Sequence, residues 1–278
     1  MTCLIADIGG TNARFAIINN GKISDIYRYR CIDFKSAYHA IQSFLLTCNV
    51  KPEFAVVAIA GVVISGMGKW TNLSWSLSEK ELKKRFGFKK VVIVNDLIPQ
   101  GMGILSLSCR EVRPLNRVKP QKNAVKVLMC MGTGLGSCII ADSKMYPSEY
   151  GQTLLPNGQI LEKVISGSKS EKNVKKVSNE YMQEDHLGCG QSKINSNLYM
   201  ALGQAAQNLM LITQPFGGIY LAGAMLSETE LKKMKIVHMI QKHPTMSNLL
   251  KSIPIFYVAN KDLAFVGLRV LAQKYGLT

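Results

Sequence analysis

The sequence predicts an α/β protein made of two duplicated lobes around a central cleft. Short apolar runs typical of strands alternate with segments of helical periodicity along all 278 residues, a length that suits two lobes. A Gly-Thr pair between two apolar runs occurs at Gly10-Thr11 and again 122 positions later, at Gly132-Thr133. The same offset places Ala16–Ile18 on Cys138–Ile140. We therefore expect one copy of a strand–turn–strand unit in each lobe, and a ligand between the two lobes.

The first half of the chain is predicted to begin with a β-meander. Gly9-Gly10 and Asn20-Gly21 separate the first three apolar runs and are typical of tight turns. Apolar residues at helical spacing between Ala37 and Cys48 predict an amphipathic helix. The expected elements are strands at residues 3–8, 14–18 and 23–32, a helix at 35–48, a strand at 54–60, a helix at 78–86 and a strand at 91–94.

The second half restarts the pattern. Asn197–Thr213 carries apolar residues along one side, as a packed helix does, whereas residues 168–195 are polar and predict a loop with at most one short helix. The other expected elements are strands at 124–131 and 137–141 around a Gly-rich turn, a helix at 159–166, strands at 218–222 and 255–258, and a helix at 263–275.

The composition predicts a globular, cytosolic protein. Hydrophobic residues make up 47% and charged residues 19%, a balance typical of folded chains. The longest apolar stretch, Phe54–Ile64, is too short to span a bilayer, and no basic segment precedes an apolar run at the N-terminus. Seven cysteines without regular spacing argue against a disulfide framework, and His186 with Cys189 offer too few ligands for structural zinc.

The net charge of +16 raises the question of a nucleic-acid partner. The basic residues are scattered, and the two denser groups, within 83–90 and 169–176, flank a short predicted helix and lie in a polar segment. This distribution favours a solvated surface with a mild attraction for anionic nucleotides. We expect neither a nucleic-acid nor a membrane partner.

The first candidate site is the segment from Asp7 to Arg14. Its simplest interpretation is a tight hairpin in which glycines supply the turn. A functional interpretation adds phosphate binding, because Gly9 and Gly10 let backbone N–H groups approach a phosphate, with Thr11 and Asn12 beside them. Asp7, at a strand end, could then hold Mg²⁺ through water, since Mg²⁺ keeps much of its hydration and prefers oxygen ligands.

The second candidate is the turn Gly132-Thr133-Gly134, which would carry little weight by itself. It lies 122 positions after the first turn, as the other repeated residues do, and this makes a shared function of the two turns a stronger hypothesis. Two related Gly-Thr turns could hold one polyphosphate from both sides.

The third candidate is Asn95-Asp96, directly after the buried strand 91–94. One interpretation is a side-chain cap on a following helix. The other is a carboxylate at the carboxyl end of a central strand, where α/β sheets place their chemistry. There, Asp96 could accept the proton of a sugar hydroxyl during phosphoryl transfer.

Six segments together resemble bacterial glucokinases of the non-ROK type, within the hexokinase–actin–Hsp70 superfamily. They occur in that family's order and span nearly the whole chain. The segments are ADIGGTNARFAI, AIAGVVISGMGKWTNLSWSLS, VVIVNDLIPQGMGI, MGTGLGSCII, GGIYLAGAM and NKDLAFVGLRVLA. The resemblance implies two ribonuclease-H-like (actin-like ATPase) lobes around a central ATP and sugar cleft. It implies a small lobe, 1–105 completed by a C-terminal helix at 262–278, and a large lobe, 106–261.

The resemblance also implies roles. Asp96 would be the general base on the 6-hydroxyl of glucose, Asp7 would hold Mg²⁺ through water, and Gly223 would lie under the adenosine of ATP. The residues implied to serve the ATP phosphates are Gly9, Gly10, Thr11, Asn12, Gly132, Thr133 and Gly134. Those implied to bind sugar are Asn72, Asn95, Asp96, Glu149, Gln152 and Glu162. A cytosolic homodimer acting in glycolysis is implied by the same resemblance.

The sequence departs from the family pattern on the sugar side. Where the family has Glu-Gly-Gly-His, this chain has Glu149, Tyr150, Gly151 and Gln152, and the chain between Gln152 and Glu162 is shorter than the family pattern. Gln can still exchange hydrogen bonds with hydroxyls. Glucose is the expected substrate. The alternatives are a kinase for another hexose or an amino sugar, and a sugar- or nucleotide-binding regulator with little catalysis.

Overall fold

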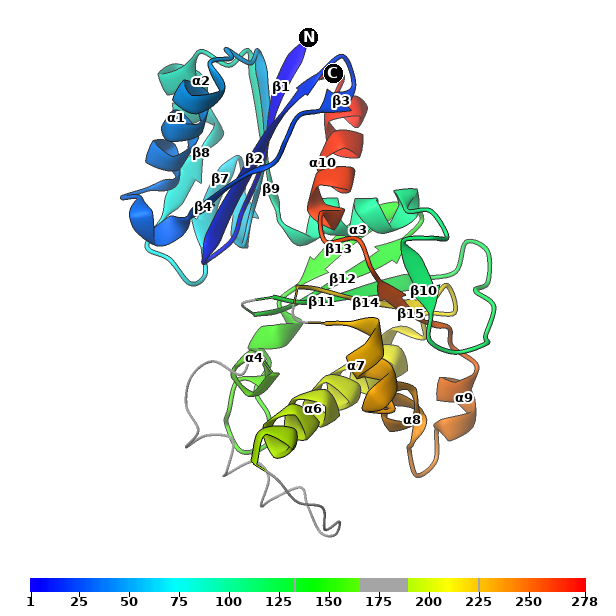
Figure 1. Cartoon of the computed structure of the whole chain (residues 1–278). Coiled ribbons are helices and arrows are strands. Elements are labelled where there is room, and N and C mark those ends of the chain that lie inside the picture. Colours follow the sequence, from blue (N-terminus) through cyan, green and yellow to red (C-terminus); the bar gives the residue numbers. More distant parts are fainter. Residues whose placement is uncertain (133, 166–189, 225) are drawn as a thin grey trace. The chain divides into compact units, whose positions relative to one another are not determined.

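The computed structural model describes residues 1–132, 134–165, 190–224 and 226–278, which form two compact units (Figure 1). Unit 1 comprises Met1–Leu107 and Asp262–Thr278, and unit 2 comprises Ser108–Lys261. Each unit has its own sheet and its own apolar core.

Unit 1 is built on a sheet of strand order β3-β2-β1-β5-β9, in which β4 also pairs with β2. Its elements are β1 (Thr2–Ile8), β2 (Asn12–Asn19), β3 (Lys22–Ile23), β4 (Tyr27–Arg30), η1 (Cys31–Asp33), α1 (Ala37–Cys48), β5 (Phe54–Ile59), β6 (Gly61–Ile64), β7 (Met67–Trp70), β8 (Ser76–Ser78), α2 (Glu79–Phe86), β9 (Lys90–Asn95), α3 (Leu97–Ser106) and α10 (Leu263–Lys274). Strands β1 and β2 form an antiparallel hairpin, while β5 runs parallel to both β1 and β9. The parallel strands are almost continuous buried apolar runs, as expected for strands covered on both faces.

Helices cover both faces of this sheet. Figure 1 shows α1 and α2 on one side of the sheet and α10 on the other. The apolar stripe of α1 packs onto the hairpin, where the rings of Phe15 and Phe44 stack with centroids 5.3 Å apart. On the opposite side, Phe265 and Leu268 are fully buried residues of α10. The helices lie along the two faces of the sheet, and the carboxyl ends of its parallel strands are where α/β sheets commonly place ligand sites.

A small antiparallel sheet, β6-β7-β8, was not among the expected elements and is tied to the end of β1. The indole N–H of Trp70, which is 3% exposed, donates to the carbonyl oxygen of Ile8 at 2.9 Å. Trp75 packs edge-on against Trp70, with ring centroids 5.8 Å apart. The loop between these two tryptophans is thereby held beside the turn that follows β1.

The described part of unit 2 contains a second six-stranded sheet, of order β10-β15-β14-β11-β12-β13. Its elements are β10 (Val112–Pro114), β11 (Lys126–Met131), β12 (Leu135–Ala141), β13 (Lys144–Ser148), η2 (Tyr150–Gln152), α4 (Leu161–Ile165), α6 (Gly190–Thr213), β14 (Ile219–Ala222), α7 (Glu228–Lys233), α8 (Ile236–Gln241), α9 (Ser247–Lys251) and β15 (Ile255–Val258). The β11–β12 hairpin and the parallel strands β14 and β15 repeat the arrangement of β2-β1-β5-β9. The repeat seen in the sequence is therefore a repeat of topology.

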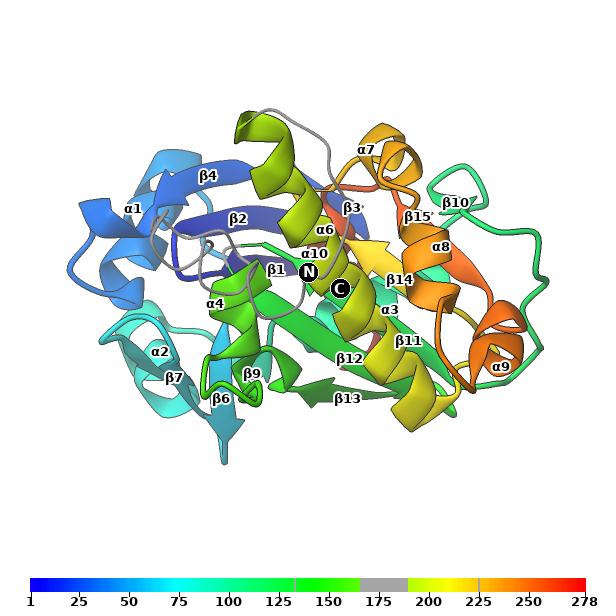
Figure 2. The same ribbon diagram turned by 90° about the horizontal axis from the view of Figure 1, so that it is seen from below.

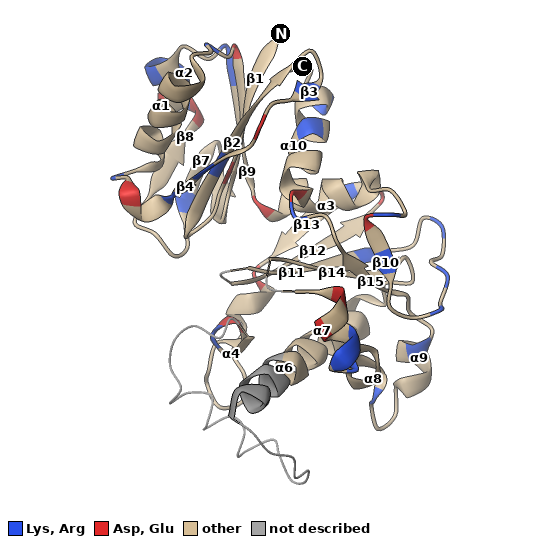
Figure 3. Ribbon diagram, viewed as in Figure 1, with Lys and Arg blue, Asp and Glu red and all other residues tan. Residues whose placement is uncertain are grey.

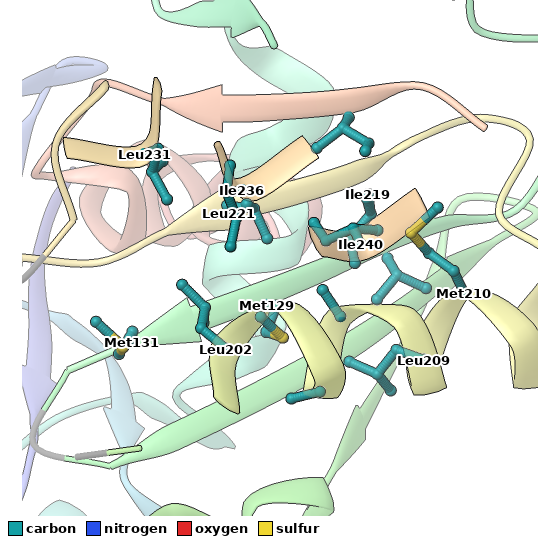
Figure 4. Close-up of a cluster of buried hydrophobic side chains, with 14 of the residues drawn as sticks. Met129, Met131, Leu202, Leu209, Met210, Ile219, Leu221, Leu231, Ile236 and Ile240 are labelled. Atoms are coloured by element: carbon teal, nitrogen blue, oxygen red, sulfur yellow. The ribbon is translucent and has the colours of Figure 1, made fainter. Parts of the chain in front are cut away.

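The core of unit 2 lies between its sheet and α6. Figure 2 shows α6 crossing the sheet, and Figure 4 shows Leu202 and Leu209 of this helix in one cluster with Met129 on β11. Ile236 and Ile240, from α8, close the same cluster. These side chains are fully or almost fully buried, so burial of apolar surface holds α6 and α8 to the sheet.

Two expectations about the elements are wrong, and several short elements were not expected. The strand expected at 23–32 is two short strands, β3 and β4, because the Ser24 hydroxyl accepts the Ile17 N–H at 3.0 Å and competes with the ladder. Residues 190–195, expected in a loop, begin α6, while residues 168–189 of that expected loop, with His186 and Cys189, lie outside the described residues. The short elements β6–β8, β10, β13 and α7–α9 were not expected, since runs this short carry too little periodicity.

Helices α3 and α10 pack at unusually short range through glycines. A Cβ added to Gly103 would lie 2.6 Å from the Leu263 carbonyl oxygen, and one added to Gly267 would lie 2.9 Å from the Pro99 Cα. Pro99 is tolerated because it falls in the first turn of α3, where its missing N–H has no helical partner to lose. The absence of side chains at these two glycines therefore sets the separation of the two helices.

We predict that Gly267→Ala destabilises unit 1 by about 1–3 kcal/mol, because the added methyl group overpacks the contact with Pro99. Helix propensity alone would change stability in the opposite direction, by about 1 kcal/mol. Both tryptophans of the chain lie in unit 1, so urea unfolding followed by tryptophan fluorescence reports it. Gln273→Ala, at an exposed position of the same helix, is the control. A gain in stability for Gly267→Ala would contradict the packing argument.

Candidate active site

The carboxyl ends of three strands form one row at the edge of the unit 1 sheet. Ile8 of β1 is aligned with Ile59 of β5, which is aligned with Asn95 of β9. The ladder continues one step further, since the Ala60 N–H donates to the Ile8 oxygen at 3.1 Å and the Asp96 N–H donates to the Ile59 oxygen at 2.9 Å. The turn after β1 and the Asn95-Asp96 pair therefore lie at the same sheet edge.

The turn from Gly9 to Asn12 is held closed by its own backbone. The Gly9 N–H donates to the Asn12 oxygen at 2.9 Å, and the Cys31 N–H donates to the Thr11 oxygen at 2.9 Å. The Cys31 thiol lies 3.5 Å from the Gly9 oxygen, and burial raises its pKa to about 11, so it stays a neutral donor. Because Gly9 uses its N–H inside the turn, donors for a phosphate would have to come from Gly10 onward.

Asn72, expected to bind sugar, lies beside this turn. A Cβ added to Gly10 would sit 3.8 Å from the Asn72 Cβ. The loop that carries Asn72 is anchored at both ends, because the Trp70 N–H donates to the Trp75 oxygen at 3.2 Å and the Thr71 N–H donates to the Ala60 oxygen at 3.4 Å. The exposed Asn72 side chain is thus presented from a fixed loop.

Asn95 and Asp96 have different roles at the start of α3. The Asn95 Oδ1 accepts the Leu97 N–H at 2.9 Å, and its Nδ2 donates to the Gly61 oxygen at 2.9 Å. Asp96 has helical backbone angles and makes no side-chain cap hydrogen bond. The cap interpretation of Asp96 is therefore wrong, since Asn95 provides the cap. Asn95 also ties β9 to β6, which limits how much of its amide remains for a ligand.

Asp7 forms an ion pair that the sequence analysis did not identify. Both Nε and Nη2 of Arg14 donate to the Asp7 Oδ2, with the Nε bond at 3.0 Å. The two side chains are 11% and 19% exposed. Arg14 lies in the segment ADIGGTNARFAI, but the sequence analysis gave it no role. Arg14 lies directly across the predicted hairpin from Asp7, and this position could have predicted the ion pair, because cross-strand pairs of opposite charge interact.

In unit 2 the second Gly-rich turn lies at the end of β11. The Gly132 N–H donates to the Gly134 oxygen at 2.9 Å, so the first glycine again closes the turn. Thr133, expected to contact phosphate, lies outside the described residues. Gly223 follows β14 with a φ of 131°, and a Cβ there would lie 2.6 Å from the Met131 carbonyl carbon. Only glycine allows this backbone to pass so close to the end of β11.

Gln152 and Glu162 are brought together against this turn. The Glu162 Oε2 accepts the Gln152 Nε2–H at 3.1 Å and the Leu135 N–H at 3.2 Å. A Cβ on Gly134 would lie 2.6 Å from the Glu162 Cδ. Glu162 therefore links the segment expected to bind sugar to the turn expected to bind phosphate.

Glu149 is exposed and precedes a short 3-10 helix, where its carbonyl oxygen accepts the Gln152 N–H at 2.8 Å. Tyr150 directs its hydroxyl to the Ala205 oxygen of α6, at 3.3 Å. Burial raises the pKa of this phenol, so the hydroxyl remains a donor. The ring packs against the core of unit 2, which shows how a tyrosine is accommodated where the resemblance implies a glycine.

Among the described residues, no helix has the length and apolarity to cross a membrane, and no group of three or more His, Cys, Asp or Glu is placed to hold a metal ion. The six cysteines outside the undescribed segment are free thiols. Figure 3 shows Lys and Arg spread over several helices and loops of each unit.

The chain is similar to known glucokinases along nearly its whole length. A family model described as Glucokinase matches residues 4–182 and 159–275. A glucokinase of Nostoc punctiforme is 25% identical over an alignment of 351 positions, which covers 99% of this chain and 100% of that protein.

Solved structures show the same fold. A glucokinase from an Antarctic psychrotroph has a TM-score of 0.75 at 23% identity, covering 98% of this chain and 99% of that one. A ROK family glucokinase from Streptomyces griseus, in complex with glucose and AMPPNP, has a TM-score of 0.67 at 16% identity, covering 99% and 100%. The predicted fold class is confirmed.

We predict that Asn95→Asp lowers the stability of unit 1 by about 1–3 kcal/mol, because it replaces the donor to Gly61 with a carboxylate oxygen. Asp96→Asn, at the neighbouring position, should stay within about 1 kcal/mol of the wild type, since Asp96 makes no side-chain cap bond. Urea unfolding of both variants compares the two positions. Equal losses would contradict the structural role of the bond from the Asn95 amide to Gly61.

Proposed function

The chain belongs to the glucokinase family, and on that premise we propose that it transfers the γ-phosphoryl group of ATP to the 6-hydroxyl of glucose. The protein is accordingly an enzyme, a kinase that acts on a sugar. The observation that carries the proposed mechanism is the position of Asp96. It stands at the end of β9, on the same sheet edge as the Gly9–Asn12 turn, while Asn95 takes the structural role.

Asp96 is the proposed general base. A sugar hydroxyl is a poor nucleophile, and a positioned carboxylate accepts its proton as the bond to phosphorus forms. The Asp96 backbone is held by its N–H bond to Ile59 and by the start of α3. We assign Asn72 and Asn95 to hydroxyls of the sugar. Asn95 would use the remaining N–H of its amide, because its oxygen and the other N–H already bond the backbone.

The Gly9–Asn12 turn is the proposed phosphate site of unit 1, and Asp7 is the proposed partner of Mg²⁺. The residues fit the ion: both bonds from Arg14 fall on the Asp7 Oδ2, which leaves Oδ1 to accept a hydrogen bond from a metal-bound water. Mg²⁺, when bound with ATP, would neutralise charge on the phosphates. In unit 2, Gly132, Thr133, Gly134 and Gly223 are the proposed nucleotide contacts.

Glu149, Gln152 and Glu162 are the proposed sugar contacts of unit 2. The Gln152–Glu162 hydrogen bond orients both side chains. It leaves the Glu162 Oε1 and the side-chain amide oxygen of Gln152 as acceptors for hydroxyls. Support for glucose and ATP comes from the family match and from the Streptomyces griseus relative bound to glucose and AMPPNP, an ATP analogue.

Finer assignments also belong to the proposal. We place the chain with the non-ROK glucokinases, because all six sequence segments follow that type in order. We further propose a cytosolic location and a homodimer, both from the resemblance.

A kinase for another hexose or an amino sugar is the second candidate function, because Gln152 and Tyr150 alter the sugar motif. A regulator with little catalysis is less well supported, since Asp96 and the turn that follows β1 are kept.

We predict that Asp96→Asn lowers the turnover number for glucose by roughly 10²- to 10⁴-fold, because an amide cannot accept the hydroxyl proton. ATP binding and the unfolding midpoint should change little, which distinguishes loss of the base from loss of the fold. Asp25→Asn, at an exposed carboxylate of the same unit, is the matched control. An ADP-release assay measures turnover, and near-normal phosphorylation by folded Asp96→Asn would refute the mechanism.

We predict that Gln152→His lowers the KM for glucose by about 2- to 10-fold, the value of one better-oriented hydrogen bond. A rigid imidazole can still donate to Glu162 while it presents its other nitrogen to the sugar. Gln159→His, in the same segment but bonded to Asn157, should leave the KM unchanged. The assay is run on glucose, mannose and glucosamine. A rise in KM for glucose, with preference for another sugar in the wild type, would favour the second candidate.

A further inference from the structure

Four charged side chains form a cluster on unit 1, and the proposed mechanism gives a role to only one of them, Asp7. Asp7 on β1 is paired across the sheet with Arg14 on β2, and Arg14 is paired with Arg28 on β4. Asp262, just before α10, contacts both arginines: its Oδ1 lies 3.3 Å from the Arg14 Nη1 and 2.8 Å from the Arg28 Nη2. The signs alternate along the cluster, so its formal charges cancel.

Arg14 is held on every side that the structure describes. Its Nε and Nη2 donate to Asp7, its Nη1 faces Asp262, and its guanidinium lies 5.4 Å from the centre of the Phe265 ring. The side chain is only 19% exposed, against 56% for Arg28. A planar guanidinium held in this way fixes the rotation of the carboxylate that it bonds, because both donors must meet one oxygen.

The hairpin does not need this ion pair in order to form. In unit 2 the hairpin β11–β12 occupies the equivalent place in its sheet, and the pair that corresponds to Asp7 and Arg14 is Cys130 and Gly136. The two hairpins have the same strand pairing without sharing these charges. A buried ion pair is also a weak source of stability, since desolvation of the charges offsets most of their attraction. The pair therefore calls for an explanation beyond the fold.

We propose that Arg14 is a positioning residue for Asp7: by bonding Oδ2 it turns Oδ1 toward the water shell of Mg²⁺, and Asp262 holds Arg14 in that setting. This inference rests on the proposed function, in which Asp7 serves the metal. Arg14 weakens the net attraction of the site for a cation, so its benefit has to be geometric. Partners that orient a metal-binding carboxylate commonly contribute 10- to 100-fold to metal affinity or activity.

The test uses Arg14→Lys, which keeps the charge but loses the planar pair of donors, and Arg28→Met as the matched control. Arg28→Met removes one positive charge from the same cluster and leaves the bonds between Arg14 and Asp7 intact. Two quantities are measured: the Mg²⁺ concentration that gives half-maximal turnover at saturating ATP and glucose, and the Mg²⁺ dependence of ADP binding by calorimetry. The second does not require turnover.

Arg14→Lys is expected to raise both Mg²⁺ requirements by roughly 10- to 100-fold, with the KM for glucose unchanged. Arg28→Met is expected to leave both requirements within about twofold of the wild type, as is usual for an exposed change away from the metal. Wild-type Mg²⁺ requirements in folded Arg14→Lys would overturn the inference. An equal rise in both variants would overturn it too, because the effect would then follow from any change in the charged cluster and not from the planar donors of Arg14.

Asp262→Asn provides a second test, which applies even where Arg14→Lys does not fold. Its side chain is 40% exposed, so the fold tolerates the change, and the Mg²⁺ requirement for ADP binding should rise severalfold as Arg14 loses its ion pair with Asp262. An unchanged requirement would overturn the role of Asp262. If the wild type binds Mg²⁺ and ADP but phosphorylates no hexose, the proposed function fails while the inference about Arg14 is still tested by calorimetry.

Discussion

The carbonyl oxygen of Ile8 is the atom on which the geometry of the candidate site depends. It accepts the Ala60 N–H, which extends the β1–β5 ladder by one step, and the buried indole N–H of Trp70. The first bond sets where the turn after β1 begins. The second sets where the loop with Asn72 lies. Since Asp96 is placed by the same ladder one strand further on, a displaced β1 end would move the proposed phosphate, sugar and base residues together.

The two units have sheets of the same topology, but their hairpins differ in charged residues. The first hairpin has four residues between the paired Ile8 and Ala13, and the second has three between Met131 and Leu135. The second turn is thus shorter, and Cys130 stands where the first hairpin has Asp7. A carboxylate for a metal-bound water is therefore available only from the first of the two hairpins. The second hairpin would contribute its backbone to the proposed nucleotide site, beside Gly223, which packs against the end of β11.

The altered sugar motif of unit 2 is compatible with a sugar kinase. Tyr150 turns its ring toward α6 and the core of the unit. Gln152 donates to Glu162, and Glu162 accepts the Leu135 N–H at the second turn. One carboxylate oxygen therefore serves both the segment expected to hold sugar and the turn expected to hold phosphate. Through this shared oxygen, a change at Gln152 can affect nucleotide binding as well as sugar binding.

The sequence by itself determined the elements with strong periodicity or strong turn chemistry. The hairpin at Gly9-Gly10, the buried strands 54–60 and 91–94, the amphipathic helix after Ser36 and the duplication are all readable from local patterns, because burial and tight turns restrict residue type locally. The motif around Asn95-Asp96 identified a candidate site for the same reason. The short strands β6–β8 and helices α7–α9 were not readable, since their residues are ordered by contacts made elsewhere.

Only the tertiary structure decided which side chain does what at the site. Asn95 takes the helix cap, which local sequence allowed for either Asn95 or Asp96, because only its amide reaches both Gly61 and Leu97. Asp262, the partner of Arg14 just before α10, lies 248 positions away, and no local pattern encodes such a separation. Glu162 reaches the second turn for a similar reason, since α4 packs beside β12. Local sequence restricts backbone shape, whereas the pairing of charges and amides depends on which segments the folded sheets bring together.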